Sequence, residues 1–430
     1  GMTVGKGGGA IASNTAIGDS ALYSNTTGGG NTANGVNALN SNTTGGGNTA
    51  NGFTALYSNT TGNDNTANGT IALYSNTTGN SNTANGSGAL FRNVTGSRNI
   101  AIGDYALFGN IEGNRNVAIG TGAIYSNSTG RSNTAIGSEA LFNNTKGSHN
   151  TAIGDSALSF PRNYGYNTAI GSKALYSNTG YNNTAIGFEA LYSNYGFYNT
   201  AIGSKALYSN SGNNNTANGG EALYSNTTGY ENTANGRAAL YSNTTGDYNT
   251  ANGRAALYSN TTGENNTGIG YLSLLNNTTG GYNTANGTSA LASNTTGYEN
   301  TANGNYALYS NTTGFENTAL GYSALYSNTT GNNNTALGNL ANVGFTNLSN
   351  ATALGNRATA SASNKVRIGN TSVSVIEGQV AFTSVSDGRI KENVQEAVAG
   401  LSFISQLRPV TYTLNTRKQD EITMQAMPDS

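Results

Sequence analysis

The chain has 430 residues, of which 60 are Gly and only 9% are charged, and its formal net charge is −1. A charge so close to zero argues against a nucleic-acid or anionic-membrane partner, because both require basic clusters. The absence of Cys excludes a disulfide scaffold, thiol catalysis and a Cys-ligated zinc site. Only three residues are Pro, so the low complexity indicates ordered repetition rather than disorder.

Residues 1–13 precede the first repeat and are interpreted as a lead-in. They open G-M-T-V-G-K-G, which reads like the middle of a longer protein, and no signal peptide is recognised in them. No apolar run in the chain approaches the roughly 20 residues that a transmembrane helix needs. Membrane insertion is therefore not expected.

Residues 14–355 repeat one short sequence. Units that begin at the Asn of N-T-A-x-G occur 21 times, and successive units lie 17 residues apart except at three places, where they lie 16 apart. The consensus is N-T-A-(I/N/L)-G-x-x-A-L-Y-S-N-T-T-G-x-x, numbered below as positions 1–17. The three short units lose their residue near the Asn-Thr-Thr-Gly segment, which indicates a turn there.

This period predicts an all-β protein, a parallel β-solenoid of about 21 coils of 17 residues. The unit is too short for helix-pair repeats, and Gly, Asn and Thr disfavour helix. We expect N-T-A-x and A-L-Y-S to form two strands, with Gly at positions 5 and 15 supplying left-handed corners. Coils stacked about 4.8 Å apart make a rod of roughly 100 Å, and identical Asn side chains can hydrogen-bond along its axis.

The apolar residues of each unit bear on how chains associate. Equivalent side chains of successive coils form a column along the rod, called here a file. Strand alternation places the Leu file of position 9 and the Tyr file of position 10 on opposite faces. Because so small a coil has one interior, the second file is expected to face other chains, most simply in a homotrimer. The alternative is a solvent-exposed Tyr ladder. Position 4 is Asn, Ile or Leu in blocks, and the face on which it lies stays open.

Charges fall mainly at the variable positions, which predicts that these are solvent-facing corners. Examples are Arg98, Arg115, Glu231, Asp247 and Glu316. The N-T-T segment is also a sequon for N-glycosylation, although Asn and Thr are good corner residues in their own right. The candidate acceptors are Asn25, Asn42, Asn59, Asn76, Asn226, Asn243, Asn260, Asn277, Asn294, Asn311 and Asn328.

Several units, such as Asn133–Ala140 and Asn150–Ala157, read N-T-A-I-G-x-x-A. This sequence pattern and its recurrence over residues 14–355 resemble the head repeats of trimeric autotransporter adhesins. The resemblance implies a left-handed parallel β-roll and a trimer. The 17-residue period is longer than the usual spacing of that family.

The composition changes after residue 355. Alternating apolar residues over 364–382 predict that 356–385 is a β connector. Residues 386–430 contain S-D-G-R-I-K-E-N-V followed by L-S-F-I-S-Q-L-R-P-V-T-Y. Apolar residues three and four apart predict an amphipathic helix that ends before Pro409, so the C-terminal segment is short and β/α. Taken alone, the first motif is an ordinary helix start capped by Ser386 or Asp387.

Together the two motifs resemble the start of the intramolecular chaperone domain found at the C-termini of phage tailspikes and tail fibres, the endosialidases among them. The resemblance implies that the domain helps three chains to trimerise and then cuts itself off between Val385 and Ser386. It makes Ser386 the nucleophile and Lys391 its base. Such a pair is chemically sound, because a desolvated Lys can take up the hydroxyl proton.

Apart from this self-cleavage, the sequence predicts no enzyme, no cofactor and no metal. His149 is the only His, and the acidic residues are scattered over the corners.

We expect an extracellular structural fibre, a phage or phage-like tail fibre that contacts a glycan or protein of a bacterial surface. A bacterial surface adhesin or filament subunit is the alternative, and an ice-binding solenoid the third. The C-terminal motif favours the fibre. The Ile-rich middle units and residues 160–166 are the least regular places.

Overall fold

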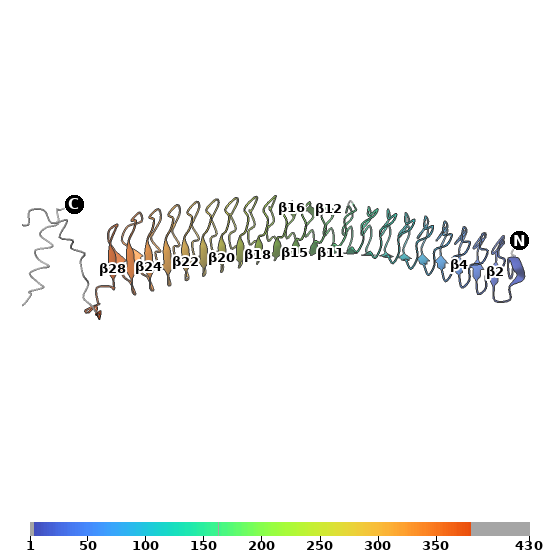
Figure 1. Cartoon of the computed structure of the whole chain (residues 1–430), viewed down its shortest axis with the longest axis horizontal. Helices are drawn as coiled ribbons and strands as arrows, with labels where there is room; N and C mark the ends of the chain where they lie inside the picture. The colour runs from blue at the N-terminus through green and yellow to red at the C-terminus, as the bar shows by residue number, and fades with distance from the viewer. Residues whose placement is uncertain (1–3, 162, 380–430) are drawn as a thin grey trace, which may run out of the picture. The chain divides into compact units, whose positions relative to one another are not determined.

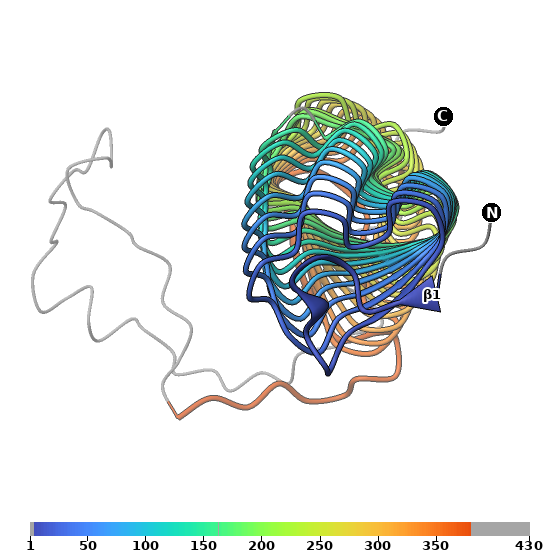
Figure 2. The same ribbon diagram turned by 90° about the vertical axis from the view of Figure 1, so that its right-hand side faces the viewer.

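The computed structural model describes residues 4–161 and 163–379. The chain divides into two units, Gly1–Val373 and Ser374–Ser430. The first unit is a parallel β-solenoid whose coils stack one on the next (Figure 1). Viewed along the stack, successive coils overlie one another with a gradual shift (Figure 2). Among the described residues, no helix is long and apolar enough to cross a membrane.

Each coil contributes one three-residue strand to a 23-stranded sheet. The sheet also includes one further strand at each end of the stack. Its strands are β1 (Val4–Gly5), β2 (Thr15–Ile17), β3 (Thr32–Asn34), β4 (Thr49–Asn51), β5 (Thr66–Asn68), β6 (Thr83–Asn85), β7 (Ile100–Ile102), β8 (Val117–Ile119), β9 (Thr134–Ile136), β10 (Thr151–Ile153), β11 (Thr168–Ile170), β13 (Thr184–Ile186), β15 (Thr200–Ile202), β17 (Thr216–Asn218), β18 (Thr233–Asn235), β19 (Thr250–Asn252), β20 (Thr267–Ile269), β21 (Thr284–Asn286), β22 (Thr301–Asn303), β23 (Thr318–Leu320), β24 (Thr335–Leu337), β26 (Thr352–Leu354) and β28 (Val366–Ile368).

The register of this sheet confirms the predicted solenoid. Strands of successive coils run parallel, with equivalent residues side by side, as in Ala234 beside Ala251. The register survives the 16-residue units, since Ala169 still pairs with Ala185. The missing residue is absorbed at the opposite corner, as expected of a turn. There the short coils form a separate three-stranded sheet of β12 (Ser177–Asn178), β14 (Ser193–Asn194) and β16 (Ser209–Asn210).

The second strand predicted for A-L-Y-S is wrong for the 17-residue coils, which form turns there. Left-handed backbone angles occur at position 7, just before this segment, and at position 9 within it, for example φ 59° at Asn37 and 51° at Leu39. The segment still bonds between coils, because Leu39 N–H donates to Ala55 O over 3.0 Å. Left-handed Leu is costly in an isolated chain. Here the repeated hydrogen bonds of the stack hold it in place.

The two recurring glycines have different roles. Gly at position 5 has a positive φ, such as 145° at Gly253, as predicted. At position 15 the predicted left-handed angle is wrong, and the reason for Gly is close packing. A Cβ on Gly246 would meet the carbonyl oxygen of Gly263 in the next coil and lie 2.6 Å from Asn243 Oδ1.

We therefore expect Gly246→Ala to destabilise the rod by about 1–3 kcal/mol, the usual cost of forcing extra volume into a packed interior. Gly220→Ala is the matched control, because the nearest atom to its added Cβ is Ser204 O at 3.9 Å. Thermal denaturation followed by circular dichroism compares the two. Equal midpoints for both variants would contradict this explanation of position 15.

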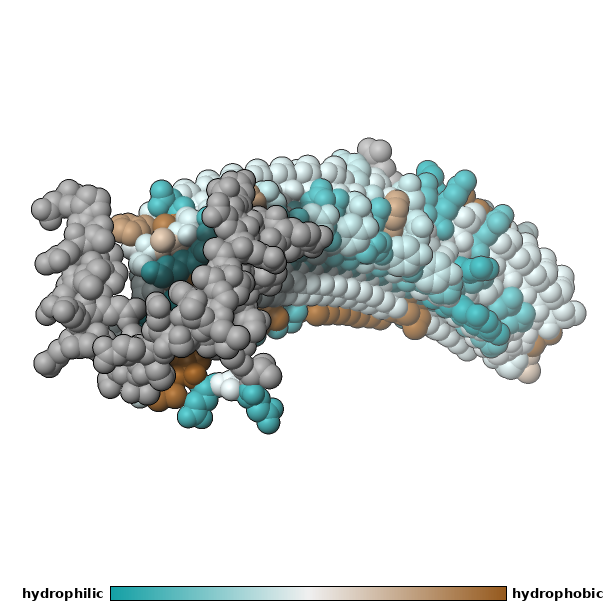
Figure 3. Space-filling view, turned by 60° about the vertical axis from the view of Figure 1, so that its left-hand side comes forward, coloured by the Kyte–Doolittle hydropathy of each residue, from teal (hydrophilic) through white to brown (hydrophobic). Residues whose placement is uncertain are grey.

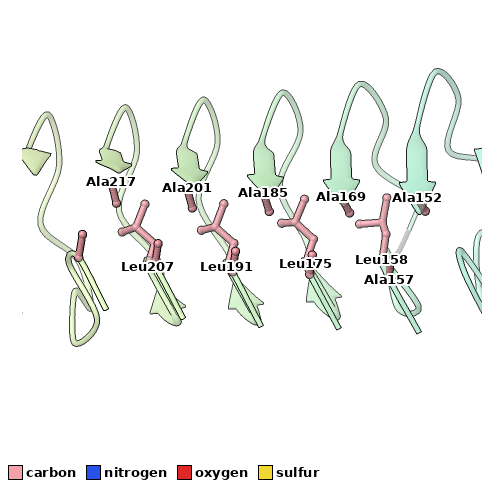
Figure 4. Packing of buried hydrophobic residues seen from close by; sticks show 14 of the residues in the cluster. Ala152, Ala157, Leu158, Ala169, Leu175, Ala185, Leu191, Ala201, Leu207 and Ala217 are labelled. Carbon is pink, nitrogen blue, oxygen red and sulfur yellow. The ribbon is translucent and has the colours of Figure 1, made fainter. Parts of the chain in front are cut away.

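The interior contains three small apolar files and two Asn files. Wherever Ala stands at positions 3 and 8 and Leu at position 9, the side chain is buried. Figure 4 shows one stretch of this core, where Leu158, Leu175, Leu191 and Leu207 lie in a row beneath the strand alanines. The Leu file is thus the inner one, and the Tyr file lies on the outside.

The predicted Asn ladder is confirmed, and there are two of them. At position 12, Asn243 Nδ2 donates to Asn226 Oδ1 at 2.8 Å and to Gly246 O at 2.9 Å. At position 1, the N–H of Asn249 donates to Asn232 Oδ1 at 2.9 Å. These hydrogen bonds repeat from coil to coil. The buried Asn side chains are therefore paired, and they avoid the free-energy cost of burying an unpaired amide.

The outward Tyr file largely covers itself. Rings of successive coils stack with centroids 4.9 to 5.3 Å apart from Tyr57 to Phe142, and again from Tyr176 to Tyr258. Stacked pairs contribute about 0.5–1.5 kcal/mol each beyond simple burial. This arrangement is the ladder that the sequence left as the alternative, so the Tyr file does not require a partner surface.

The ends of the rod differ from the sequence-based boundaries. At the N-terminus, β1 pairs antiparallel with β2, and a 3-10 turn, η1 (Gly8–Ala10), follows it. At the other end β28 pairs with β26 in the solenoid register after only 14 residues. Residues 356–369 are therefore a last coil rather than part of the connector. A short pair, β25 (Asn342–Val343) with β27 (Thr359–Ala360), joins this coil to the one before it.

Candidate binding edge

Positions 16 and 17 of the coils form a continuous corner beside the sheet, called here the variable edge. Four of the five charged residues predicted to face solvent, Arg98, Arg115, Glu231 and Glu316, are exposed on it. Asp247 is half-buried, and its Oδ1 accepts a hydrogen bond from Tyr230 N–H at 2.9 Å. The prediction that the variable positions are corners is thereby confirmed.

The backbone holds this edge in fixed register. The residue at position 17 has a left-handed φ, 60° at Arg98 and 58° at Arg115. Its N–H donates to the carbonyl at position 16 of the preceding coil, as from Arg115 to Ser97 O over 3.1 Å. Equivalent side chains therefore project at the spacing of the coils, about 4.8 Å.

The chemistry of the edge changes along the rod. Its first coils carry mostly Gly and Asn. A basic segment follows, then an aromatic one, then a long segment that mixes acidic and aromatic side chains. The basic segment is Arg98, Arg115, Arg131 and His149; the aromatic segment is Tyr166, Tyr181, Phe197 and Tyr198; the mixed segment includes Tyr230, Glu231, Asp247, Tyr248, Glu264, Tyr282, Tyr298, Glu299, Phe315 and Glu316.

Two grooves lie on the variable edge. The first, about 420 Å³, runs along the basic segment between Asn80 and Ser132 and is lined by three Arg side chains. The second, about 390 Å³, lies in the mixed segment and includes Glu264, Tyr282 and Glu299. One edge thus presents two grooves of opposite charge.

The mixed segment also carries a perturbed hydroxyl. A hydrogen bond with the Tyr248 side chain, aided by desolvation and nearby carboxylates, raises the pKa of Tyr230 to about 12. The Tyr230 hydroxyl therefore stays protonated to a higher pH than that of an ordinary tyrosine, whose pKa is about 10. The two rings meet edge to face with centroids 5.1 Å apart.

The coil of residues 150–166 interrupts the regular network, as its sequence indicated. Pro161 occupies the position of the ladder Asn, so the side chain of Asn144 has no donor above it. Asn144 Oδ1 is the one buried side-chain polar atom without a partner in the described part of the chain. Below this coil His149 stacks on Tyr166 at 4.9 Å. Within residues 4–161 and 163–379, no group of three His, Cys or acidic residues could hold a metal.

The other predicted site residues fall in two places. Val385, Ser386 and Lys391 lie outside the described residues, as does the predicted helix before Pro409. The eleven sequon Asn residues are all buried, with at most 3% of their surface exposed. Their amide nitrogens point into the ladder, as at Asn243, so a glycan there would have to break it. The folded rod is not suited to accept sugars at these positions.

The sequence left position 4 unassigned, and the structure places it outward on the sheet. Seven successive coils carry Ile there: Ile102, Ile119, Ile136, Ile153, Ile170, Ile186 and Ile202. We call these residues the Ile stripe. Four of them are 36–40% exposed and the others half-buried. Figure 3 shows apolar surface gathered in a strip along one face of the rod.

Residues 386–425 match the family model described as the chaperone of endosialidase. No curated protein matches the chain. A β-solenoid followed by this segment fits a structural protein of the phage tail-fibre or tailspike type. The matched family is an intramolecular chaperone domain associated with autoproteolysis.

Proposed function

We propose that this chain forms a homotrimeric fibre of a phage or phage-like tail, outside the cell, which contacts a glycan or protein of a bacterial surface. The observation that carries the proposal is a solenoid of about 21 coils in the same chain as an endosialidase-type chaperone segment. The rod supplies reach and stiffness, and its variable edge supplies side chains for recognition. The chaperone segment brings three chains together and is then released at Val385–Ser386.

The Ile stripe supports the trimer and indicates which face turns inward. An exposed apolar strip seven coils long spans roughly 30 Å at the coil spacing, and such strips mark interaction surfaces. At both ends of the stripe Asn takes position 4, at Asn85 and Asn218. Further along the rod two such Asn residues pair, as Asn51 Nδ2 donates to Asn68 Oδ1 at 2.8 Å. The occupant we assign is a second and third copy of this chain, because the chaperone segment acts on identical chains.

We expect the uncleaved chain to sediment at three times its 43.8 kDa mass. Changing Ile136, Ile153 and Ile170 together to Lys should give monomers with unchanged circular dichroism, because the added charges cannot be buried between chains. The control adds charge at the variable edge instead, with Ser132→Lys and His149→Lys, and should remain trimeric. A monomeric wild-type chain, or a trimer that survives the Ile changes, would refute the proposed interface.

A further inference from the structure

We propose that the groove of the basic segment binds a linear anionic glycan that runs along the rod. The inference rests on the proposed surface contact for the source of the ligand, and it names the chemistry that this part of the edge recognises. The groove is lined by Asn80, Ser81, Ser97, Arg98, Asn114, Arg115, Arg131 and Ser132.

The arrangement of the three Arg side chains carries the inference. Arg98 and Arg115 occupy position 17 of consecutive coils, about one coil spacing apart. Arg131 occupies position 16 of the next coil and lines the same groove. Like charges stacked this closely repel one another. A bound row of anionic groups would relieve that repulsion and form charge-assisted hydrogen bonds.

No carboxylate in the described part of the chain performs this role. Among residues 4–161 and 163–379, the only ion pair joins Lys205 and Glu189 at 3.8 Å. Glu112 lies three residues before Arg115, yet none of its oxygens comes within 4 Å of a guanidinium nitrogen. All three Arg side chains are exposed and remain available to a ligand.

The groove is also built in advance. Ser97 N–H donates to Asn114 Oδ1 at 2.8 Å, and Asn114 Nδ2 donates to Glu112 O at 2.7 Å, which fixes the polar floor. The N–H of Arg98 donates to Asn80 O at 2.9 Å and fixes the wall. A preformed groove loses little entropy on binding. The neutral polar side chains between the cations, such as Ser81 and Ser132, suit the hydroxyl groups of a sugar.

A glycan fits better than a nucleic acid. Single-stranded nucleic acids require aromatic rings on which bases stack, and the lining of this groove contains none. Duplexes require a broad basic surface, whereas the chain as a whole carries a net charge of −1.

The test uses the uncleaved full chain and three polymers with one backbone: dextran, carboxymethyl-dextran and dextran phosphate. Biolayer interferometry should detect binding to one or both charged polymers, which separates carboxylate from phosphate as the recognised group, and none to dextran. Arg98→Gln with Arg115→Gln should lower the affinity about tenfold or more and reduce the salt slope by about 2.

The matched control is Arg237→Gln with Arg254→Gln. These residues also stand one coil apart, but they do not line this groove, and Arg254 Cζ lies 5.7 Å from the Tyr271 ring centroid. The control should bind within twofold of the wild-type chain. Equal losses in both pairs, no binding to either charged polymer, or tighter Arg-dependent binding of a single-stranded oligonucleotide would each overturn the inference. Rods that bind the charged polymers but no bacteria would instead overturn the proposed surface contact alone.

Discussion

Asn243→Asp is expected to open the rod around one coil. The new carboxylate would face Asn226 Oδ1 and Gly246 O, two acceptors that now receive the Asn243 amide hydrogens at 2.8 and 2.9 Å. One carboxylate oxygen would still accept a hydrogen bond from Asn260 Nδ2, as Asn243 Oδ1 does at 2.8 Å, but the other would face the two acceptors. A buried charge that is not fully compensated costs about 3–5 kcal/mol. Because each coil contacts only its neighbours, the loss should stay local. Hydrogen exchange followed by mass spectrometry should show protection falling by several orders of magnitude in residues 226–263.

Asn333→Asp provides the comparison for this change. Asn333 is exposed at position 17, with a left-handed φ of 57° that Asp also tolerates. The same change of amide to carboxylate should leave exchange unaltered there. If both variants behave alike, the Asn ladder does not hold the coils together as we describe.

Ser386→Ala is expected to abolish processing of the chain completely. With its chaperone segment complete, the wild-type chain should divide between Val385 and Ser386 because the Ser386 hydroxyl, deprotonated by Lys391, attacks the preceding carbonyl. The peptide C–N bond then breaks as its nitrogen takes up the proton from Lys391, and water hydrolyses the resulting ester to release the fragment. Lys391→Ala should have the same effect. Mass spectrometry of the products should identify a released fragment that begins at Ser386, and neither variant should yield it.

Ser384→Ala is the control, since Ser384 lies only two residues away and has no assigned role. It should be processed as the wild-type chain is. Continued cleavage of Ser386→Ala at Val385 would exclude the Ser–Lys mechanism. Loss of cleavage in Ser384→Ala as well would indicate that the local conformation, rather than the nucleophile, was lost.

The solenoid could be predicted from sequence because its signal is the period itself. A repeat of 17 residues with Asn and Gly at fixed places requires equivalent residues to stack, and both Asn ladders follow. The path of the chain within one coil could not be predicted. Leu39 at φ 51° contradicts single-residue preferences and is stabilised only by hydrogen bonds to the neighbouring coils.

The candidate site could be predicted only in part. Variation marked positions 16 and 17 as exposed corners, and Arg98 and Arg115 lie there. These two residues line one groove together with Arg131. This groove depends on how three coils pack against one another, and the sequence of one repeat unit does not show it. The Ile stripe was missed because position 4 holds both Ile and Asn, so its composition does not reveal its face. Only the inward Ala beside it shows that position 4 points outward.

Electron cryo-microscopy of the uncleaved full chain tests the central claim most directly. We predict rods about 100 Å long with a coil spacing of about 4.8 Å, in which three solenoids surround one axis, with the Ile stripe facing inward and the Arg98 corner outside. Isolated single solenoids, or an assembly with the variable edge buried at its axis, would contradict the account.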